Sequence, residues 1–154
     1  MSAPSHNPIH AEMAGRLGNG VKRVESQIER VKSRALRPLD LTLPQYVTLM
    51  MLKLEPEQTA AQLSRTVLVS TQTMATILKN LERKGLIERS HTDLHARVLL
   101  NTLTKEGDKL VRKADQVVAK IEQDLKEAFS PSEFEQFTAY LERAQEHLAN
   151  IEHR

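Results

Sequence analysis

Residues 59–86 have the sequence TAAQLSRTVLVSTQTMATILKNLERKGL, and this stretch decides the fold. Thr59 and Gln62 have the spacing of a capping box, which starts a short helix. Ser70 can cap a second helix, and Gly85 supplies the left-handed residue that commonly ends one. Two short helices joined by a tight turn form a helix-turn-helix.

The second of these helices has an apolar face and a polar face. Its predicted core positions are Met74, Ile77, Leu78 and Leu81. In the major groove, a Gln can bond an adenine edge, a Thr can offer a hydroxyl or a methyl, and cations can hold phosphates. We therefore predict DNA contacts at Ser70, Thr71, Gln72, Thr73, Thr76, Lys79 and Asn80. A solvated surface helix has the same pattern, so this face alone leaves both interpretations open.

The residues that follow predict a hairpin. Two short strands are expected at 86–89 and 97–100, with the polar tract 90–95 as the tip. A helix-turn-helix followed by a hairpin that carries a cation is the order of a winged helix. At the base of the hairpin, Arg97 can enter or flank the minor groove, although an exposed arginine is the simpler alternative. We add His95 and Arg97 to the predicted DNA contacts.

Long amphipathic helices are predicted on both sides of this lobe. The first has apolar residues at steps of three and four over residues 9–37 and ends at Pro38. Thr42 begins the next helix, with Pro44 in its first turn. After the hairpin, Thr104 caps a helix whose expected inward residues are Leu110, Ala114, Val117, Ile121 and Leu125. A final helix follows the capping box of Ser130 and Glu133 and continues to the chain end.

The predicted fold is therefore mainly α with a small β-hairpin wing. We treat residues 1–154 as a single domain, with a winged helix DNA-binding lobe at 41–104 and dimerisation helices at 9–37 and 105–154. A terminal amphipathic helix in so small a chain has little left to cover it, which favours a homodimer. The alternative is a helical bundle closed within one chain.

Composition and charge narrow the function classes. The 154-residue chain is 40% hydrophobic and 27% charged, which fits a folded protein of one domain. It has no Cys, and no apolar run long enough to span a bilayer or act as a leader, so we expect cytoplasmic residence. The net charge of +2 divides into +6 for residues 1–105 and −4 for residues 106–154. The basic part raises the expectation of an anionic partner.

Three segments, LTLPQY at 41–46, LERKGLIER at 81–89 and LTKEG at 103–107, together resemble the MarR family of bacterial transcription regulators. The resemblance implies a dimer held by its terminal helices, binding to a pseudo-palindromic operator and release by a small, often phenolic, ligand. Two departures matter. Ala75-Thr76 stands where members often carry Thr-Arg, and His95-Ala96-Arg97 keeps only the last wing cation. Wing binding is thus expected to be weaker, or dependent on pH through His95.

The resemblance also implies a ligand cavity between the dimerisation helices and the DNA-binding lobe. Its candidate residues are Met13, Arg16, Tyr46 and Met50, with Arg16 as the partner of a carboxylate or phenolate. Simple core packing of Tyr46 and the methionines is the competing interpretation. Residues 91 and 95 have the spacing of helical zinc ligands but fall in a hairpin, where that spacing does not converge. We expect no metal, no cofactor and no catalytic residues.

The sequence therefore predicts a dimeric, sequence-specific DNA-binding transcription regulator, a repressor released by a small aromatic or phenolic ligand. The alternative is a helical, dimeric protein-interaction module that has lost specific DNA binding, suggested by Ala75, Thr76 and Ala96.

Overall fold

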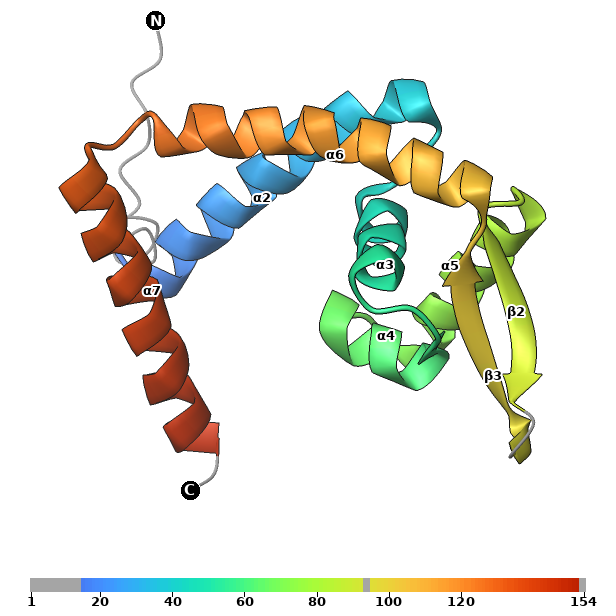
Figure 1. Cartoon of the computed structure of the whole chain (residues 1–154). Helices are drawn as coiled ribbons and strands as arrows, with labels where there is room; N and C mark the ends of the chain where they lie inside the picture. The colour runs from blue at the N-terminus through green and yellow to red at the C-terminus, as the bar shows by residue number, and fades with distance from the viewer. Residues whose placement is uncertain (1–14, 93–94, 153–154) are drawn as a thin grey trace, which may run out of the picture. The chain divides into compact units, whose positions relative to one another are not determined.

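The computed structural model describes residues 15–92 and 95–152, and backbone contacts divide the chain into two compact units, 1–118 and 119–154. The elements in chain order are α2 (Leu17–Leu36), η1 (Arg37–Leu39), α3 (Leu43–Leu54), β1 (Gln58–Thr59), α4 (Ala60–Val67), α5 (Thr71–Arg83), β2 (Ile87–Thr92), β3 (His95–Leu103), α6 (Lys105–Lys126) and α7 (Pro131–Glu152) (Figure 1). The mainly helical architecture with a small antiparallel sheet confirms the predicted fold class.

The helix-turn-helix forms where its caps predict it. The Thr59 hydroxyl accepts a hydrogen bond from the Gln62 amide at 3.2 Å, while the Gln62 side chain accepts one from the Thr59 amide at 2.8 Å. Ser70 accepts from the backbone N–H of Thr73 at 3.0 Å. Gly85 has φ +70°, a conformation that costs glycine little, and it ends α5.

The helices before the lobe also follow their signals. Pro38 lies in η1, directly after α2 ends at Leu36. Thr42 and Gln45 form a full capping box at the start of α3. The first helix was predicted over residues 9–37, but α2 begins only at Leu17, so residues 15 and 16 are not helical. Residues 9–14 of that prediction lie outside the described residues.

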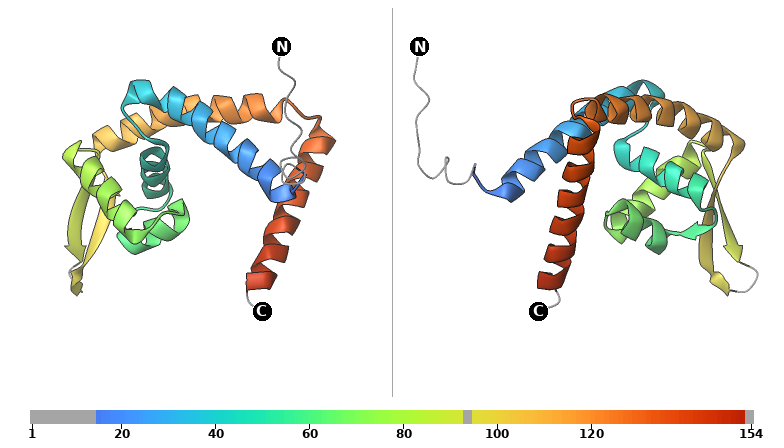
Figure 2. Two further views of the ribbon diagram at one scale, coloured as in Figure 1. Left: turned by 180° about the vertical axis from the view of Figure 1, so that it is seen from behind. Right: turned by 60° about the vertical axis from the view of Figure 1, so that its left-hand side comes forward.

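The core of the first unit is built from one face of each helix. The apolar stripe of α5 faces inward as predicted, and Thr48 of α3 reaches Met74 with 3.9 Å between hydroxyl oxygen and sulfur. Figure 2 shows α3 between α6 and the helix pair α4 and α5. The largest fully buried apolar side chains are Leu36, Leu49, Leu52, Leu63, Met74, Leu78, Leu81 and Val111.

The sheet corrects two expectations. Strand order is β1-β3-β2, all antiparallel, and the two-residue β1 was not predicted. The buried Asn101 holds it in place, because the Asn101 amide donates to the Gln58 carbonyl at 2.8 Å. The hairpin is also longer than expected: β2 continues to Thr92 and β3 begins at His95. Backbone ladder bonds need no apolar side chains, so polar residues extend both strands.

The inward face of α6 agrees with the prediction only in part. Ala114 is buried as predicted, and Leu110, Val117 and Ile121 are half-buried, but Val111 and Val118 are buried in addition and Leu125 is exposed. The reason lies in the first turn, where a Cβ on Gly107 would collide with the Leu86 carbonyl. This close approach turns the Gly107 side of α6 toward the core, so the buried face is centred on Val111, Ala114 and Val118, and the predicted stripe lies at its margin.

The second unit contains the end of α6 and the whole of α7. Glu133 accepts from the Ser130 backbone N–H at 2.8 Å, which forms the predicted cap of α7. The Ser130 hydroxyl and N–H hold the pKa of the Glu133 carboxyl below its usual range. Phe129 stacks on Phe137 with ring centroids 5.5 Å apart. No residue of α7 is buried.

Candidate nucleic-acid interface

The turn between α4 and α5 presents the start of α5 to solvent. Leu68 ends α4 in the left-handed conformation, with φ 59°, and Ser70 then caps α5. In Figures 1 and 2, α4 and the end of the β2–β3 hairpin lie at the same end of the first unit. Because α5 begins four residues after α4 ends, the first turn of α5 and the hairpin are found toward the same end of the first unit.

The outward face of α5 carries most of the predicted contacts. Ser70, Thr71, Gln72, Thr73, Thr76 and Lys79 are all exposed. Local bonds orient two of the hydroxyls: Thr73 lies 2.8 Å from the Ser70 hydroxyl, and Thr76 donates to the Gln72 carbonyl at 3.2 Å. Because the Thr76 proton is used inside the helix, this side chain offers a methyl group and oxygen lone pairs to a partner.

Two side chains on this face remain open to a partner. Within the described residues, the amide of Gln72 and the ammonium of Lys79 make no hydrogen bond or ion pair with the protein. A Gln amide has both a donor and an acceptor, which matches the N6 and N7 edge of adenine. The ammonium suits a phosphate.

Asn80 departs from this group. It is half-buried, accepts from Arg83 at 3.0 Å, and lines a cavity that also contains Arg37. This position lies away from the first turn of α5, on the side that faces η1. The structure thus brings together six of the seven predicted α5 positions and directs the seventh elsewhere.

The wing positions lie farther from the lobe than expected. His95 pairs with Thr92 and is the first residue of β3, so Arg97 is two residues beyond it, near the outer end of the hairpin. The hairpin base is instead the pair of Ile87 and Leu103. Placing Arg97 at the base was wrong, because the strands extend beyond their predicted ends. The side chains of residues 92–97 lie outside the described part of the structure.

Arg65 is a further cation near this surface that the sequence patterns did not predict as a DNA contact. This exposed residue lies in the last turn of α4, the first helix of the helix-turn-helix. In such motifs the first helix crosses the DNA backbone, where a cation is useful. In the sequence, Arg65 is recognisable only as a cation outside the apolar stripe of α4. That position becomes informative once α5 is assigned to the major groove, because α4 is then the helix that crosses the DNA backbone.

An ion network joins the lobe to the start of α6. Asp108 accepts from Lys53 of α3 at 2.5 Å and from Arg112 at 2.8 Å. The Lys53 and Arg112 hydrogen bonds hold the pKa of the Asp108 carboxyl below its usual range. Because Lys53 lies on α3 and Asp108 on α6, the pair fixes the lobe to the helix that leaves it.

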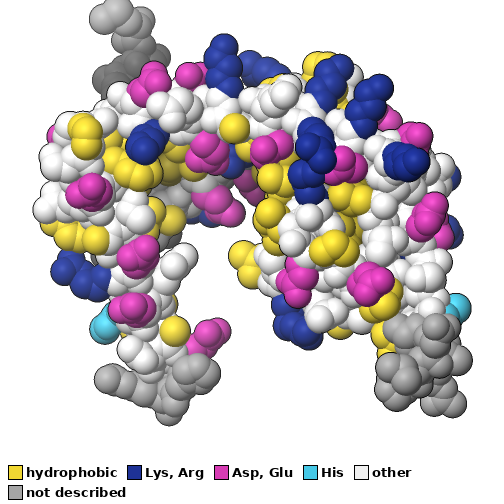
Figure 3. Space-filling view, in the orientation of Figure 1, with side chains coloured by type: hydrophobic (Ala, Val, Ile, Leu, Met, Phe, Trp, Pro, Cys, Tyr) yellow, Lys and Arg dark blue, Asp and Glu magenta, His cyan; other side chains and the backbone are white. Residues whose placement is uncertain are grey.

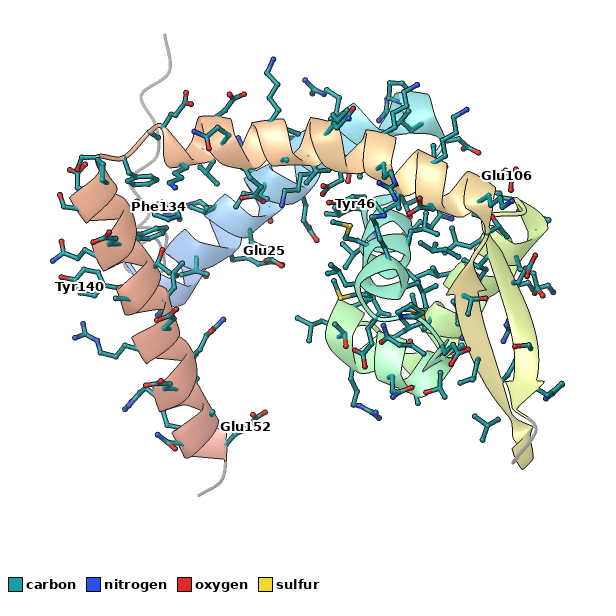
Figure 4. The ribbon with its side chains drawn as sticks, in the orientation of Figure 1. Glu25, Tyr46, Glu106, Phe134, Tyr140 and Glu152 are labelled. Atoms are coloured by element: carbon teal, nitrogen blue, oxygen red, sulfur yellow. The ribbon has the colours of Figure 1, made fainter. Side chains whose placement is uncertain are left out.

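The residues predicted for a ligand cavity are only partly placed. Tyr46 is buried below the first half of α6, and its hydroxyl donates to Asp115 at 2.8 Å (Figure 4). Met50 is half-buried, Arg16 precedes α2, and Met13 lies outside the described residues. Burial of Tyr46 favours its role in packing.

Two helices leave apolar side chains uncovered. On α2 these are Leu17, Val21, Val24 and Val31, and on α7 they are Phe137, Tyr140, Leu141, Leu148 and Ile151. Figure 3 shows hydrophobic side chains on the surface of the second unit, and Figure 4 marks Tyr140 on α7. No described helix is both long and apolar enough to cross a membrane. Among residues 15–92 and 95–152, no three His, Asp or Glu side chains are grouped to hold a metal ion.

A capped helix-turn-helix followed by a two-stranded hairpin defines a winged helix protein. The model of the MarR family matches residues 39–98. The chain is 39% identical over 102 residues to the HTH-type transcriptional repressor Rv2887 of Mycobacterium tuberculosis, which is 66% of this chain and 73% of that protein. The chain belongs to the MarR family, which confirms the resemblance seen in the three sequence segments.

Solved structures agree with this assignment. Rv2887 in complex with p-aminosalicylic acid superimposes with a TM-score of 0.69 at 33% identity, covering 85% of this chain and 99% of that chain. The MepR–DNA complex of Staphylococcus aureus gives a TM-score of 0.81 at 25% identity, covering 86% of this chain and 98% of that chain. The relatives named here are a transcriptional repressor and a protein bound to DNA.

Proposed function

We propose that this chain is a dimeric transcription repressor that binds a pseudo-palindromic operator and is released by a small aromatic acid. The observation that carries the proposal is the solvent-facing side of α5, where the side chains of Gln72 and Lys79 make no hydrogen bond or ion pair with the described residues. The DNA complex of MepR supports DNA as the partner of this surface. The proposed role requires no catalytic activity, and binding to an operator is consistent with a cytoplasmic protein.

In the proposed complex, the first turns of α5 enter the major groove. Gln72 reads a base edge, and Thr76 offers its methyl to a thymine. Lys79 and Arg65 hold phosphates on either side, which fixes the orientation without reading sequence. His95 and Arg97 reach the flanking minor groove from the hairpin. The remaining predicted contacts, Ser70, Thr71 and Thr73, belong to the cap and first turn of α5, the part of the helix that enters the groove in this complex.

The uncovered faces of α2 and α7 are proposed to pair with a second copy of the chain. Apolar side chains exposed along a whole helix typically mark an association surface. Two-fold pairing would present two α5 helices to successive major grooves, about 10 base pairs apart.

For the effector, we propose an aromatic acid bound by Arg16, Tyr46, Met50 and Met13. The complex of Rv2887 with p-aminosalicylic acid supports this class of ligand. Because the Tyr46 hydroxyl already donates to Asp115, the ring of Tyr46 is the part available to an aromatic ligand, and Arg16 supplies the positive charge. A ligand that prefers a dimer with a different α5 spacing lowers DNA affinity by its differential binding.

The test is fluorescence anisotropy with the DNA upstream of the chain's own coding sequence, at several salt concentrations. We expect tight binding at low salt that weakens steeply as salt rises. Salicylate should then release the DNA. Undetectable DNA binding at low salt would favour the protein-interaction module instead. So would weak binding that Gln72→Ala leaves unchanged.

A further inference from the structure

A second polar site lies on the first unit, at the C-terminal end of α5. It is a cavity of about 590 Å³ between η1, the start of α3 and the last turn of α5. In the left view of Figure 2, η1 lies above this end of α5. Its volume is within the range of small-molecule sites. None of the residues proposed to hold the aromatic effector lines it.

Three cations from two elements line this cavity. Arg37 comes from η1, and Arg83 and Lys84 come from the end of α5. The only carboxylate in the lining is Asp40, which lies 2.9 Å from the Lys84 ammonium. The lining therefore carries a net charge of +2.

The dipole of α5 explains why two of these three cations lie at this end of the helix, but not the third. Cations near a helix C-terminus are favourable by themselves, and that suffices for Arg83 and Lys84. Arg37 belongs to another element and makes no side-chain hydrogen bond or ion pair within the described residues. A third cation, from another element, at a cavity that two cations already line is explained by an anion between them.

Neutral groups in the wall are suited to the same ligand. Thr42 and Ser33 contribute hydroxyls to the lining. Asn80 accepts from Arg83 through its carbonyl oxygen at 3.0 Å, which leaves its amide nitrogen to donate. The Asp40 side chain is 91% exposed, so its pair with Lys84 is weak and open to competition.

We propose that this cavity binds a small, multiply charged oxyanion, such as a phosphorylated metabolite, through Arg37, Arg83 and Lys84. The anion displaces the carboxylate of Asp40 from Lys84. The cavity lies at the opposite end of α5 from the first turn that is proposed to enter the major groove, because the 13 residues of α5 span about 20 Å. The three cations of this site are shared neither with the proposed aromatic effector site nor with the proposed operator contacts.

The probe is inorganic pyrophosphate, titrated by calorimetry into the full-length protein without DNA, at constant ionic strength set with sodium chloride. We expect saturable binding of one pyrophosphate per chain. Arg37→Gln should weaken it by about tenfold, since a charge-assisted bond to an oxyanion is lost. Arg34→Gln is the matched control, because it removes an exposed cation of α2 that does not line the cavity, and it should leave binding unchanged.

A variant that is expected to strengthen pyrophosphate binding makes the test independent of folding defects, because a folding defect could only weaken binding. Asp40 has φ 52°, a conformation that Asn tolerates, so Asp40→Asn removes the competing charge and keeps the backbone. It should tighten pyrophosphate binding several-fold. The proposal is overturned if binding is not saturable, if Arg34→Gln and Arg37→Gln weaken it equally, or if Asp40→Asn weakens it. Release of operator DNA by salicylate is a separate readout, so either claim can fail alone.

Discussion

Helices α5 and α7 have similar apolar spacing, yet their apolar faces have opposite surroundings. On α5, Met74, Leu78 and Leu81 are wholly buried against the rest of the lobe. On α7, Phe137 is 41% exposed and Leu148 is 64% exposed. One helix is completed by its own chain, whereas the other presents the same kind of face to solvent. Periodicity therefore predicts an association surface but does not say which chain supplies its partner.

The largest expected effect is in the lobe. Leu78→Ala should lower the free energy of unfolding by about 3 kcal/mol, because it removes a fully buried side chain and leaves a cavity. Leu54→Ala is the matched control, since this side chain is 69% exposed and its removal should cost less than about 0.5 kcal/mol. Urea unfolding measures both. Equal losses would mean that the described core is wrong.

The corresponding change on α7 should act on association. Leu141→Ser should raise the dimer dissociation constant by about thirtyfold, as expected for about 2 kcal/mol of lost apolar burial. The control is Glu142→Gln, the neighbouring residue on the same helix. Analytical ultracentrifugation separates the outcomes. If Leu141→Ser left the dissociation constant unchanged, α7 would lie outside the dimer interface.

On the polar side of α5, base and phosphate contacts should respond differently. Gln72→Ala should cost about 1–3 kcal/mol of operator affinity and relax the preference at one base position. Lys79→Ala should weaken all sequences alike and lower the salt slope by about 1. Lys109→Ala on the first turns of α6 is the control cation. A uniform loss in Gln72→Ala would contradict its role in reading sequence.

The turn that presents α5 carries a smaller effect. Leu68 is 89% exposed and has φ 59°, which an L side chain rarely adopts. Leu68→Gly should therefore raise the free energy of unfolding by about 0.5–1 kcal/mol. Val67→Gly, one residue earlier in α4, should lower it. Destabilisation by both substitutions would show that Leu68 makes contacts that outweigh its backbone strain.

The smallest effect concerns acid stability. The lowered pKa of Asp108 means that the stability contributed by this carboxylate is present above its unfolded pKa of about 4 and is lost as the pH falls through its lower folded pKa. Asp108→Asn should thus destabilise the protein at neutral pH and make its acid limb shallower. Glu106→Gln is the control on the same turn of α6. Parallel pH profiles for wild type and Asp108→Asn would contradict this account.

Local signals explain why much of the fold was predictable. The caps at Thr59 and Ser70, and the glycine at position 85, act within one or two turns of chain, so they are visible in sequence. The face of α6 was predicted only in part because the helix has two adjacent apolar stripes. Only the approach of Gly107 to the Leu86 carbonyl, a contact between segments, selects the buried stripe.

The same limit applies to the candidate site. The outward face of α5 follows from periodicity alone, and six of its seven predicted positions lie together. Asn80 differs from the other six because its side chain accepts a hydrogen bond from Arg83 and lines a cavity beside η1. Those tertiary surroundings are not visible in the sequence. The length of the hairpin depends on backbone pairing, which polar side chains do not reveal. For this reason Arg97 was placed at the wrong end of the strand.

The most direct test of the central claim is in vitro selection of bound DNA from a random library by the purified protein. Two α5 helices on a two-fold dimer predict an enriched pseudo-palindrome with half-sites about 10 base pairs apart. The Gln72→Ala variant should select the same spacing with one relaxed position in each half-site. Enrichment of a single half-site, or no enrichment at all, would contradict the dimeric DNA-binding regulator proposed here.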